Sequence, residues 1–117
     1  MKLPVFKKCL VVGVRYRTPF ERTVAASVAP YDGLILEREP HNSHDSGAVK
    51  VLHGSTHIGY VQRDVAAPLS RLMDNGIFYM ATVVKNCRSS IIVNIHPIDP
   101  PKHEKVTKEQ APLEVVE

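Results

Sequence analysis

The chain has 117 residues, a hydrophobic fraction of 44% and a net charge of +3. This length predicts one domain with a single hydrophobic core, and the hydrophobic fraction excludes a disordered chain. No apolar run reaches the roughly 18 residues that a membrane span needs. The short apolar patch near the N-terminus has lysines on both sides, which makes it a poor signal peptide. We therefore expect a cytoplasmic protein with no membrane partner.

The first third of the chain predicts two strands and a long connection. A strand is expected over residues 7–14, because the segment is β-branched and almost continuously apolar, as in a barrel interior. Gly13 within it indicates a bulge or a close approach of two backbones. Residues 15–33 predict an irregular connection in which 21–28 form one short helical turn. The second strand is expected over 34–38.

The remaining elements complete a small barrel. Strands are expected over 48–53 and 57–61, joined as a hairpin, and then over 77–85 and 90–95. Between these pairs, Asp64 is the expected N-cap of a helix through about Asn75, closed by Gly76. Six short strands that follow one another favour antiparallel pairing and closure. The expected fold is mostly β, a six-stranded OB-like or SH3-like barrel with one or two short helices.

Charge is distributed unevenly along the chain. We expect residues 1–99 to form the barrel domain and residues 100–117 to form a charged, proline-containing flexible tail. The tail holds three lysines and four glutamates, which leaves 12 basic and 8 acidic side chains in the domain. A basic domain suits a polyanionic partner such as nucleic acid, because neutralised phosphates release counterions.

Signatures of catalysis or metal binding are absent from the sequence. It contains neither a P-loop nor a G-x-S-x-G nucleophile elbow, and it has no CxxC or Cys/His zinc pattern. Cys9 and Cys87 fall in predicted strands, where buried core cysteines are the simplest interpretation. Metal-ligand types are supplied by four histidines, whose spacing matches no zinc pattern: His41, His44, His53 and His57. Cross-strand pairing of the last two is the simpler account. We expect no enzyme activity, cofactor or metal.

Three polar side chains follow the first strand where it leaves the core: Arg15, Tyr16 and Arg17. Arginine offers a fork of donors for phosphate oxygens, and tyrosine offers a face on which an unpaired base can stack. On a strand Tyr16 would point away from both arginines, so a bend is needed to bring them together. The alternative is an ordinary solvated strand end with Tyr16 half-buried.

Two later segments add candidate residues. In the polar loop 41–47, Asp45 is a good acceptor for a terminal 3′-hydroxyl, although the loop's polar side chains are equally suited to capping their own backbone. In 58–64, Gly59 permits a close backbone approach and Tyr60 can lie across the barrel face. Arg63 can reach phosphate. The alternative is that Tyr60 belongs to the core and Arg63 is merely solvated.

Several blocks in order resemble the HIRAN domain: Leu36–Asn42 with Asp45, Ala48–Val51, Ile58–Val61 and Val65–Ser70. The resemblance spans about residues 8–97. HIRAN domains occur fused to DNA-remodelling helicases and nucleases and as stand-alone bacterial and phage proteins, and this chain is more similar to the stand-alone type. The family is expected to have a six-stranded, modified OB barrel. Its helicase-linked members bind the 3′ end of single-stranded DNA in a pocket, which serves the remodelling of stalled replication forks.

The resemblance implies a role for each matching residue. Arg15 would contact phosphate, Tyr16 would stack on a base and Asp45 would hold the 3′-hydroxyl. His44 stands where the helicase-linked form has an aromatic residue, and Tyr60 stands where that form has a histidine. The expected rim of the pocket is formed by Lys7, Lys8, Arg17 and Arg63.

Two departures from the helicase-linked form leave alternatives open. The last strand lacks an aromatic residue that its pocket uses, and the connection over 18–33 differs in length and sequence. The expected function is non-catalytic recognition of single-stranded DNA, at its 3′-hydroxyl end, in DNA repair, replication-fork or phage DNA processing. General single-strand binding, an adaptor that recruits a helicase or nuclease in trans, and binding of another phosphorylated or hydroxylated ligand remain alternatives.

Overall fold

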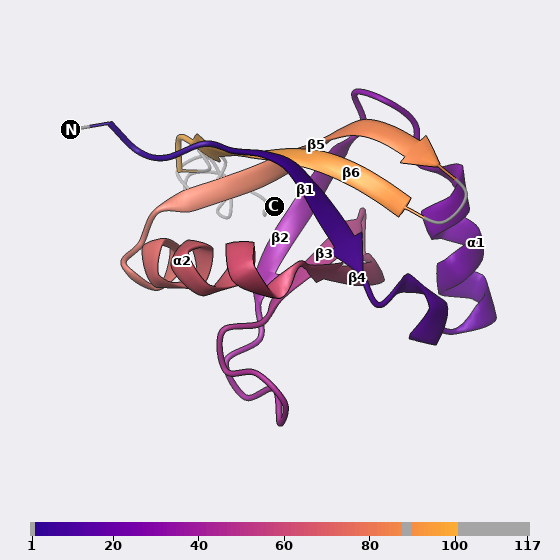
Figure 1. Cartoon of the computed structure of the whole chain (residues 1–117), viewed down its shortest axis with the longest axis horizontal. Helices are drawn as coiled ribbons and strands as arrows, with labels where there is room; N and C mark the ends of the chain where they lie inside the picture. Colours follow the sequence, from indigo (N-terminus) through magenta and orange to yellow (C-terminus); the bar gives the residue numbers. More distant parts are fainter. Residues whose placement is uncertain (1, 88–89, 101–117) are drawn as a thin grey trace, which may run out of the picture.

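The computed structural model describes residues 2–87 and 90–100, which form a closed antiparallel barrel of six strands (Figure 1). The strands are β1 (Phe6–Val12), β2 (Gly33–Arg38), β3 (Val49–His53), β4 (Thr56–Val61), β5 (Phe78–Cys87) and β6 (Ser90–Ile98). Around the barrel they follow the order β1-β4-β3-β2-β5-β6. The predicted fold class, a mostly β barrel with one or two short helices, is confirmed.

One hydrophobic core fills the barrel. Leu34, Ile58 and Ile95 are fully buried on three different strands, and α2 (Arg63–Asp74) adds Leu69 to the same cluster. Each side chain of this size stabilises the fold by roughly 1.5–3 kcal/mol when it is fully buried. The helices α1 (Pro19–Ser27) and α2 lie on opposite sides of the barrel in Figure 1. The barrel is thus a rigid frame that carries polar connections at its ends.

β1 ends two residues earlier than predicted, and its irregularity lies elsewhere. Gly13 follows the strand with a φ of 77°, in the left-handed region that glycine adopts without strain. It opens η1 (Val14–Tyr16), a single 3₁₀ turn. The register of β1 against β6 shifts instead between Phe6 and Cys9, where Lys8 has a φ of 55°. The left-handed Gly13 and the 3₁₀ turn that follows it bend the chain directly before Arg15 and Tyr16.

Gly59 confirms the predicted close approach of two backbones. A side-chain carbon placed on it would lie 2.7 Å from the Val12 carbonyl oxygen and 2.7 Å from Val11 Cγ1. β1 pairs with β4 only through Val11 opposite Val61 and Val12 opposite Tyr60. Because Gly59 has no side chain, β1 and β4 can approach closely enough to pair and close the barrel next to η1. We call this short β1–β4 pairing the seam.

α1 occupies the connection that was predicted to be irregular, and it is longer than the single turn expected over 21–28. Thr18 Oγ1 accepts a hydrogen bond from the Glu21 backbone N–H, and the Glu21 carboxylate accepts one from the Thr18 backbone N–H. This reciprocal capping box satisfies two donors at the helix start. Pro19 takes the first helical position, where its missing N–H has no cost. The prediction of irregular structure here is wrong.

α2 begins with Gln62 as its N-cap, so the predicted Asp64 cap is wrong. The Gln62 side chain makes no capping bond, because it accepts a hydrogen bond from the Leu10 backbone N–H (2.6 Å) and donates one to Asp64 (2.7 Å). Asp64 lies in the first turn, where a carboxylate interacts favourably with the helix dipole. The predicted end is confirmed, since Gly76 follows the helix with a φ of 91°.

Two predictions near the ends of β5 and β6 need correction. Cys9 is buried as predicted, whereas Cys87 lies exposed at the end of β5. β6 runs three residues beyond its predicted end, through Pro97. β1 pairs with β6 only as far as Phe6 opposite Ile95, so the missing N–H of Pro97 costs no ladder bond on that side. Apart from Pro100, the predicted tail lies outside the described residues.

Candidate functional site

Arg15 and Tyr16 form an exposed pair on η1. The Arg15 guanidinium lies 5.0 Å from the centroid of the Tyr16 ring, and its Nη2 donates a hydrogen bond of 3.0 Å to the Tyr16 hydroxyl. Tyr16 is 76% exposed rather than half-buried. The 3₁₀ turn supplies the bend that the sequence required, since a continuous strand would separate the two side chains. The pair presents a cation and an aromatic face to solvent.

Arg17 turns away from this pair toward α1. Its Nε and Nη2 atoms both lie 3.0 Å from Glu21 Oε1, and its side chain is 24% exposed. A hydrogen bond from the Thr18 backbone and the charge of Arg17 lower the pKa of Glu21. Arg22 donates to the Arg17 carbonyl oxygen at 2.6 Å. Arg17 thus stabilises the start of α1, and Arg15 is the better placed of the two for an external phosphate.

Tyr60 lies on β4 beside η1. Its ring is 3.8 Å from the position that a side-chain carbon would take on Gly13. Its hydroxyl donates a hydrogen bond of 2.7 Å to Glu39, and His57 meets its ring edge-on with centroids 4.8 Å apart. Burial and the bond to Glu39 raise the pKa of Tyr60. The side chain is half-buried, so it is neither a full core residue nor a freely open stacking face.

The loop between β2 and β3 is held by its own polar groups. Asn42 Oδ1 accepts hydrogen bonds from the backbone N–H groups of His44 (2.8 Å) and Asp45 (3.0 Å). Asp45 Oδ1 accepts one from the Gly47 backbone N–H (2.9 Å). The interpretation that these side chains cap their own turns is therefore confirmed. It leaves the second carboxylate oxygen of Asp45 for other partners.

Glu39 joins this loop to β4. Its Oε1 accepts hydrogen bonds from the Asn42 side-chain amide (2.8 Å) and from the Tyr60 hydroxyl (2.7 Å). These two bonds, the first being the larger cause, lower the pKa of Glu39. A chain of hydrogen bonds thus runs from Tyr60 through Glu39 and Asn42 to the backbone of Asp45. Because the Tyr60 ring also lies against Gly13, this chain fixes the Asp45 loop relative to η1.

The outer side of Asp45 faces Arg63 at the start of α2. Asp45 Oδ2 lies 3.5 Å from Arg63 Nε, with side-chain exposures of 30% and 78%. His44 is exposed next to Asp45. An ion pair this exposed contributes little to stability, roughly 0–1 kcal/mol. It is therefore a contact that a ligand can replace at low cost.

Arg38 holds the same loop from the β2 side. Its guanidinium donates to the carbonyl oxygens of Ser46 (2.9 Å) and Ala48 (2.7 Å), and its Nε lies 2.8 Å from Asp74 Oδ1 on α2. The hydrogen bonds from Arg38 to Asp74, and then the Arg38 charge, lower the pKa of Asp74. The Arg38 side chain is only 15% exposed. Its role is to pin the loop against α2 rather than to meet a ligand.

Lys7 and Lys8 lie near the start of β1, whereas η1 follows the end of that strand. Lys8 donates its backbone N–H to Asn94 on β6 (2.9 Å). A strand rises about 3.3 Å per residue, so the four steps from Lys8 to Val12 at the end of β1 correspond to roughly 13 Å. The structure therefore does not bring the two lysines to the Arg15–Tyr16 pair.

The histidines of the β3–β4 hairpin are not cross-strand partners. His53 pairs with Thr56 in the ladder, and His53 Nε2 lies 4.0 Å from Asp32 Oδ2. His57 Nε2 lies 2.9 Å from the Gly59 carbonyl oxygen, and burial lowers the pKa of His57. Within residues 2–87 and 90–100, no three His, Cys, Asp or Glu side chains gather as a metal site. No helix in that part of the chain is long and apolar enough to cross a membrane.

Comparison with known proteins identifies the family. The model of the HIRAN domain matches residues 8–98, which is most of the chain. The chain belongs to the HIRAN domain family. The helicase-like transcription factor of Oryctolagus cuniculus is 35% identical over 75 residues, which are 63% of this chain and 7% of that protein. A chromatin regulator from Arabidopsis thaliana, putative SWI/SNF-related subfamily A member 3-like 1, is 38% identical over 56 residues, 47% of this chain and 6% of that protein.

Two solved structures share the fold. The crystal structure of the HIRAN domain of human HLTF has a TM-score of 0.67 at 20% identity, covering 97% of this chain and 90% of that one. A crystal structure of a protein from Lactobacillus plantarum has a TM-score of 0.64 at 22% identity, covering 79% and 95%. At these identities the likeness supports the fold alone. The matched curated relatives are far longer than this chain, which spans 7% or less of them.

Two residues that organise this HIRAN barrel's candidate site were not predicted from the sequence: Arg38 and Glu39. They lie inside the block that carried the resemblance, Leu36–Asn42, so the signal was a cluster of charged and amide side chains at a strand end. Their roles depend on partners 21 to 36 positions away, as in Glu39 with Tyr60 and Arg38 with Asp74. Such distant pairing cannot be derived from local sequence patterns.

We expect Glu39→Gln to lower the stability of this HIRAN domain at neutral pH and to have a smaller effect in acid. The pKa of Glu39 is lowered in the fold, so its carboxylate stabilises the protein above its unfolded pKa of about 4.3. That contribution is lost as the pH falls through the lowered folded value. Urea midpoints of both proteins at neutral pH and below pH 4 measure the difference. Glu37→Gln is the control, since Glu37 is an exposed partner of Lys50 on the barrel's outer face. If the urea midpoints of the parent and Glu39→Gln differed by the same amount at both pH values, the stabilising role of the ionised Glu39 carboxylate would be contradicted.

Proposed function

We propose that this HIRAN domain binds single-stranded DNA without catalysing a reaction. The observation that carries the proposal is the exposed Arg15–Tyr16 pair on η1. An exposed tyrosine face accepts an unpaired base by stacking, worth roughly 1–3 kcal/mol per base. The guanidinium beside it can hold the neighbouring phosphate through two parallel hydrogen bonds. Duplex DNA offers no unstacked base to such a pair, which favours single strands.

We further propose that Asp45 accepts a hydrogen bond from the 3′-hydroxyl of the strand. Asp45 Oδ1 is occupied by the Gly47 N–H, while the partner of Oδ2 among the described residues is the exposed Arg63. A carboxylate repels phosphate and accepts well from a hydroxyl, so it suits the end of a strand better than its continuous backbone. The chain of hydrogen bonds from Tyr60 through Glu39 and Asn42 supports the proposal, because it holds the Asp45 loop in a fixed position relative to Tyr60, which lies beside η1.

The proposed pocket is formed by Arg15, Tyr16, His44, Asp45 and Tyr60. Arg63 stands at its rim, where its guanidinium can leave Asp45 and meet a phosphate. Arg17 is engaged with Glu21, and Lys7 and Lys8 lie near the start of β1, so all three supply positive potential rather than direct contacts. The proposed setting is DNA repair, a replication fork or phage DNA processing, beside a helicase or nuclease in trans.

The end preference is tested with short strands that carry either a 3′-hydroxyl or a 3′-phosphate. We expect the hydroxyl strand to bind about tenfold or more tightly, because a hydrogen bond to a charged group contributes about 1.5–3 kcal/mol. Asp45→Asn keeps an oxygen for the Gly47 N–H and removes the charge. We therefore expect this variant to bind the 3′-hydroxyl and 3′-phosphate strands with similar affinity. Glu37→Gln is the matched control. Equal binding of both strands by the parent protein would refute the role of Asp45 and leave a general single-strand binder.

The barrel's outer face favours one second candidate, a protein–protein adaptor. Ile35 is 53% exposed and pairs with Met80, while Phe78 (40%) pairs with Ile98 (38%), which places apolar side chains together across β2, β5 and β6. A helicase or nuclease that docks there would bury apolar surface, so its affinity should respond little to salt. Binding of DNA through phosphates should weaken steeply with salt. A salt titration therefore separates the two functions.

A further inference from the structure

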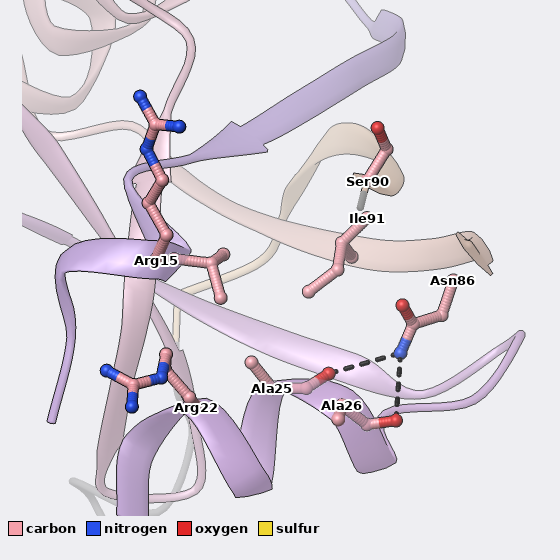
Figure 2. Close-up of a pocket in the computed structure, with 8 residues that line it drawn as sticks. Arg15, Arg22, Ala25, Ala26, Asn86, Ser90 and Ile91 are labelled. Carbon is pink, nitrogen blue, oxygen red and sulfur yellow. Dashed lines mark hydrogen bonds between the residues drawn. The ribbon is translucent and has the colours of Figure 1, made fainter. Parts of the chain in front are cut away.

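A groove lies between η1, α1 and the hairpin formed by β5 and β6, and Arg15 is one of its lining residues (Figure 2). Its volume is about 390 Å³, within the range of roughly 300–1,000 Å³ typical of small-ligand sites. Its apolar lining comes from Val14, Ala25, Ala26 and Ile91. A groove of this size and lining suits a flat aromatic ring, and it is made of residues other than those proposed to hold the strand end, except for Arg15.

Asn86 on β5 fixes the polar chemistry of the groove. Its amide nitrogen lies 3.1, 3.3 and 2.9 Å from three carbonyl oxygens at the end of α1, those of Ala25, Ala26 and Val28. Carbonyl oxygens only accept, so the nitrogen must face α1 and Oδ1 must face the other way. Figure 2 shows this oxygen directed away from α1, toward the space beside Ile91. The groove thus contains an acceptor whose orientation is locked.

Two cations flank the opposite end of the groove. Arg15 and Arg22 both line it, and Figure 2 shows their side chains on the side away from Asn86. Arg22 uses Nη1 for the Arg17 carbonyl oxygen, which leaves its other donors for a ligand. An apolar slot with a fixed acceptor inside and guanidinium groups outside matches a nucleotide, with the base inserted and its phosphates at the mouth.

We propose that this groove is a base-reading subsite for a nucleotide inside the strand, and that Asn86 Oδ1 accepts a hydrogen bond from the exocyclic amino group of cytosine or adenine. Thymine has a carbonyl oxygen at the ring position that carries this amino group, and its one ring donor, N3–H, lies at the neighbouring position. Thymine would therefore lack this hydrogen bond when it sits in the groove in the same orientation. The inference rests on the proposed single-strand binding and adds a base preference to it. Arg15 borders both sites, so one strand can pass from the groove to the end pocket.

The first test uses the parent protein and three short strands. All end in the same 3′-terminal thymidine, and the preceding nucleotides are all thymine, all cytosine or all 5-methylcytosine. 5-Methylcytosine carries the methyl group of thymine and the amino group of cytosine, so it isolates the hydrogen bond. We expect both cytosine strands to bind about three- to tenfold more tightly than thymine, the usual worth of one hydrogen bond. Equal binding of all three would overturn the inference and leave the proposed function standing. Binding of none would overturn both.

The second test closes the groove. Ala26 is exposed on α1 and lines the groove, so Ala26→Leu fills it with a good helix former and leaves the Asn86 amide in place. Thr23→Leu is the matched control, since Thr23 is exposed on the same helix outside the groove lining. We expect Ala26→Leu to abolish the cytosine preference while the preference for a 3′-hydroxyl persists. A cytosine preference that survives in Ala26→Leu would place base reading outside this groove and refute the assignment.

Discussion

Replacing Tyr16 with alanine is expected to weaken binding of single-stranded DNA by roughly five- to 150-fold, the equivalent of about 1–3 kcal/mol of base stacking. Tyr16 is 76% exposed, and its side-chain contacts are with Arg15. Its removal therefore costs little stability, and a loss of binding reports on the ligand. Fluorescence anisotropy with labelled oligonucleotides measures the effect, and circular dichroism checks the fold.

Two matched substitutions make this prediction specific. Tyr31 is 89% exposed on the turn between α1 and β2, so Tyr31→Ala removes a tyrosine of similar exposure away from η1. Arg15→Ala should also weaken binding and should lower its salt dependence, because one phosphate contact is lost. Arg71→Ala on α2 is the corresponding control for an exposed arginine. Unchanged affinity in both Tyr16→Ala and Arg15→Ala would disprove the assignment of the site to η1.

Gly59→Ala should cost the fold about 2–3 kcal/mol, toward the upper end of the usual penalty for overpacking. The added carbon would lie 2.7 Å from the Val12 carbonyl oxygen, and backbone cannot move aside as a flexible side chain can. Relief of this clash requires β1 and β4 to separate at the seam that precedes η1. The variant should therefore lose DNA affinity as well as stability, as measured by urea unfolding and anisotropy.

Gly33→Ala provides the comparison for that variant. Gly33 also lies on a barrel strand, yet its added carbon would meet only the mobile end of Met80, at 2.9 Å from Cε. We expect a change of less than about 1 kcal/mol, since a methionine end can rotate away. If the two glycine variants proved equally stable, the close approach at Gly59 would not be what closes the barrel.

Local patterns in the sequence predicted most of the barrel. The first strand was recognisable because its segment is β-branched and almost continuously apolar, and Gly76 marked the end of α2 correctly. The start of α1 was missed although Thr18 and Glu21 have the spacing of a capping box. The N-cap of α2 was misplaced because Gln62 uses its side chain on Leu10 of β1, a contact that only barrel closure creates.

Contacts within the candidate site were predictable only between residues that are neighbours in the chain. Arg15 and Tyr16 were named as candidates from their types and their position after the first strand, and the 3₁₀ turn that follows Gly13 brings their side chains together. The link from Tyr60 to Glu39 and the groove between Ala26 and Asn86 join residues 21 to 60 positions apart. Because these contacts depend on strand order and register, no local periodicity indicates them.

The most direct test of single-strand binding is the anisotropy of a short 5′-labelled single strand, titrated with the parent protein at several salt concentrations. We expect saturable binding that weakens with salt, with a log–log slope of about −0.7 for each phosphate neutralised. Arg15 with one of Arg22 and Arg63 would give a slope of about −1.4, and all three arginines would give about −2.1. The absence of an anisotropy change at low salt would contradict the account and would favour the adaptor.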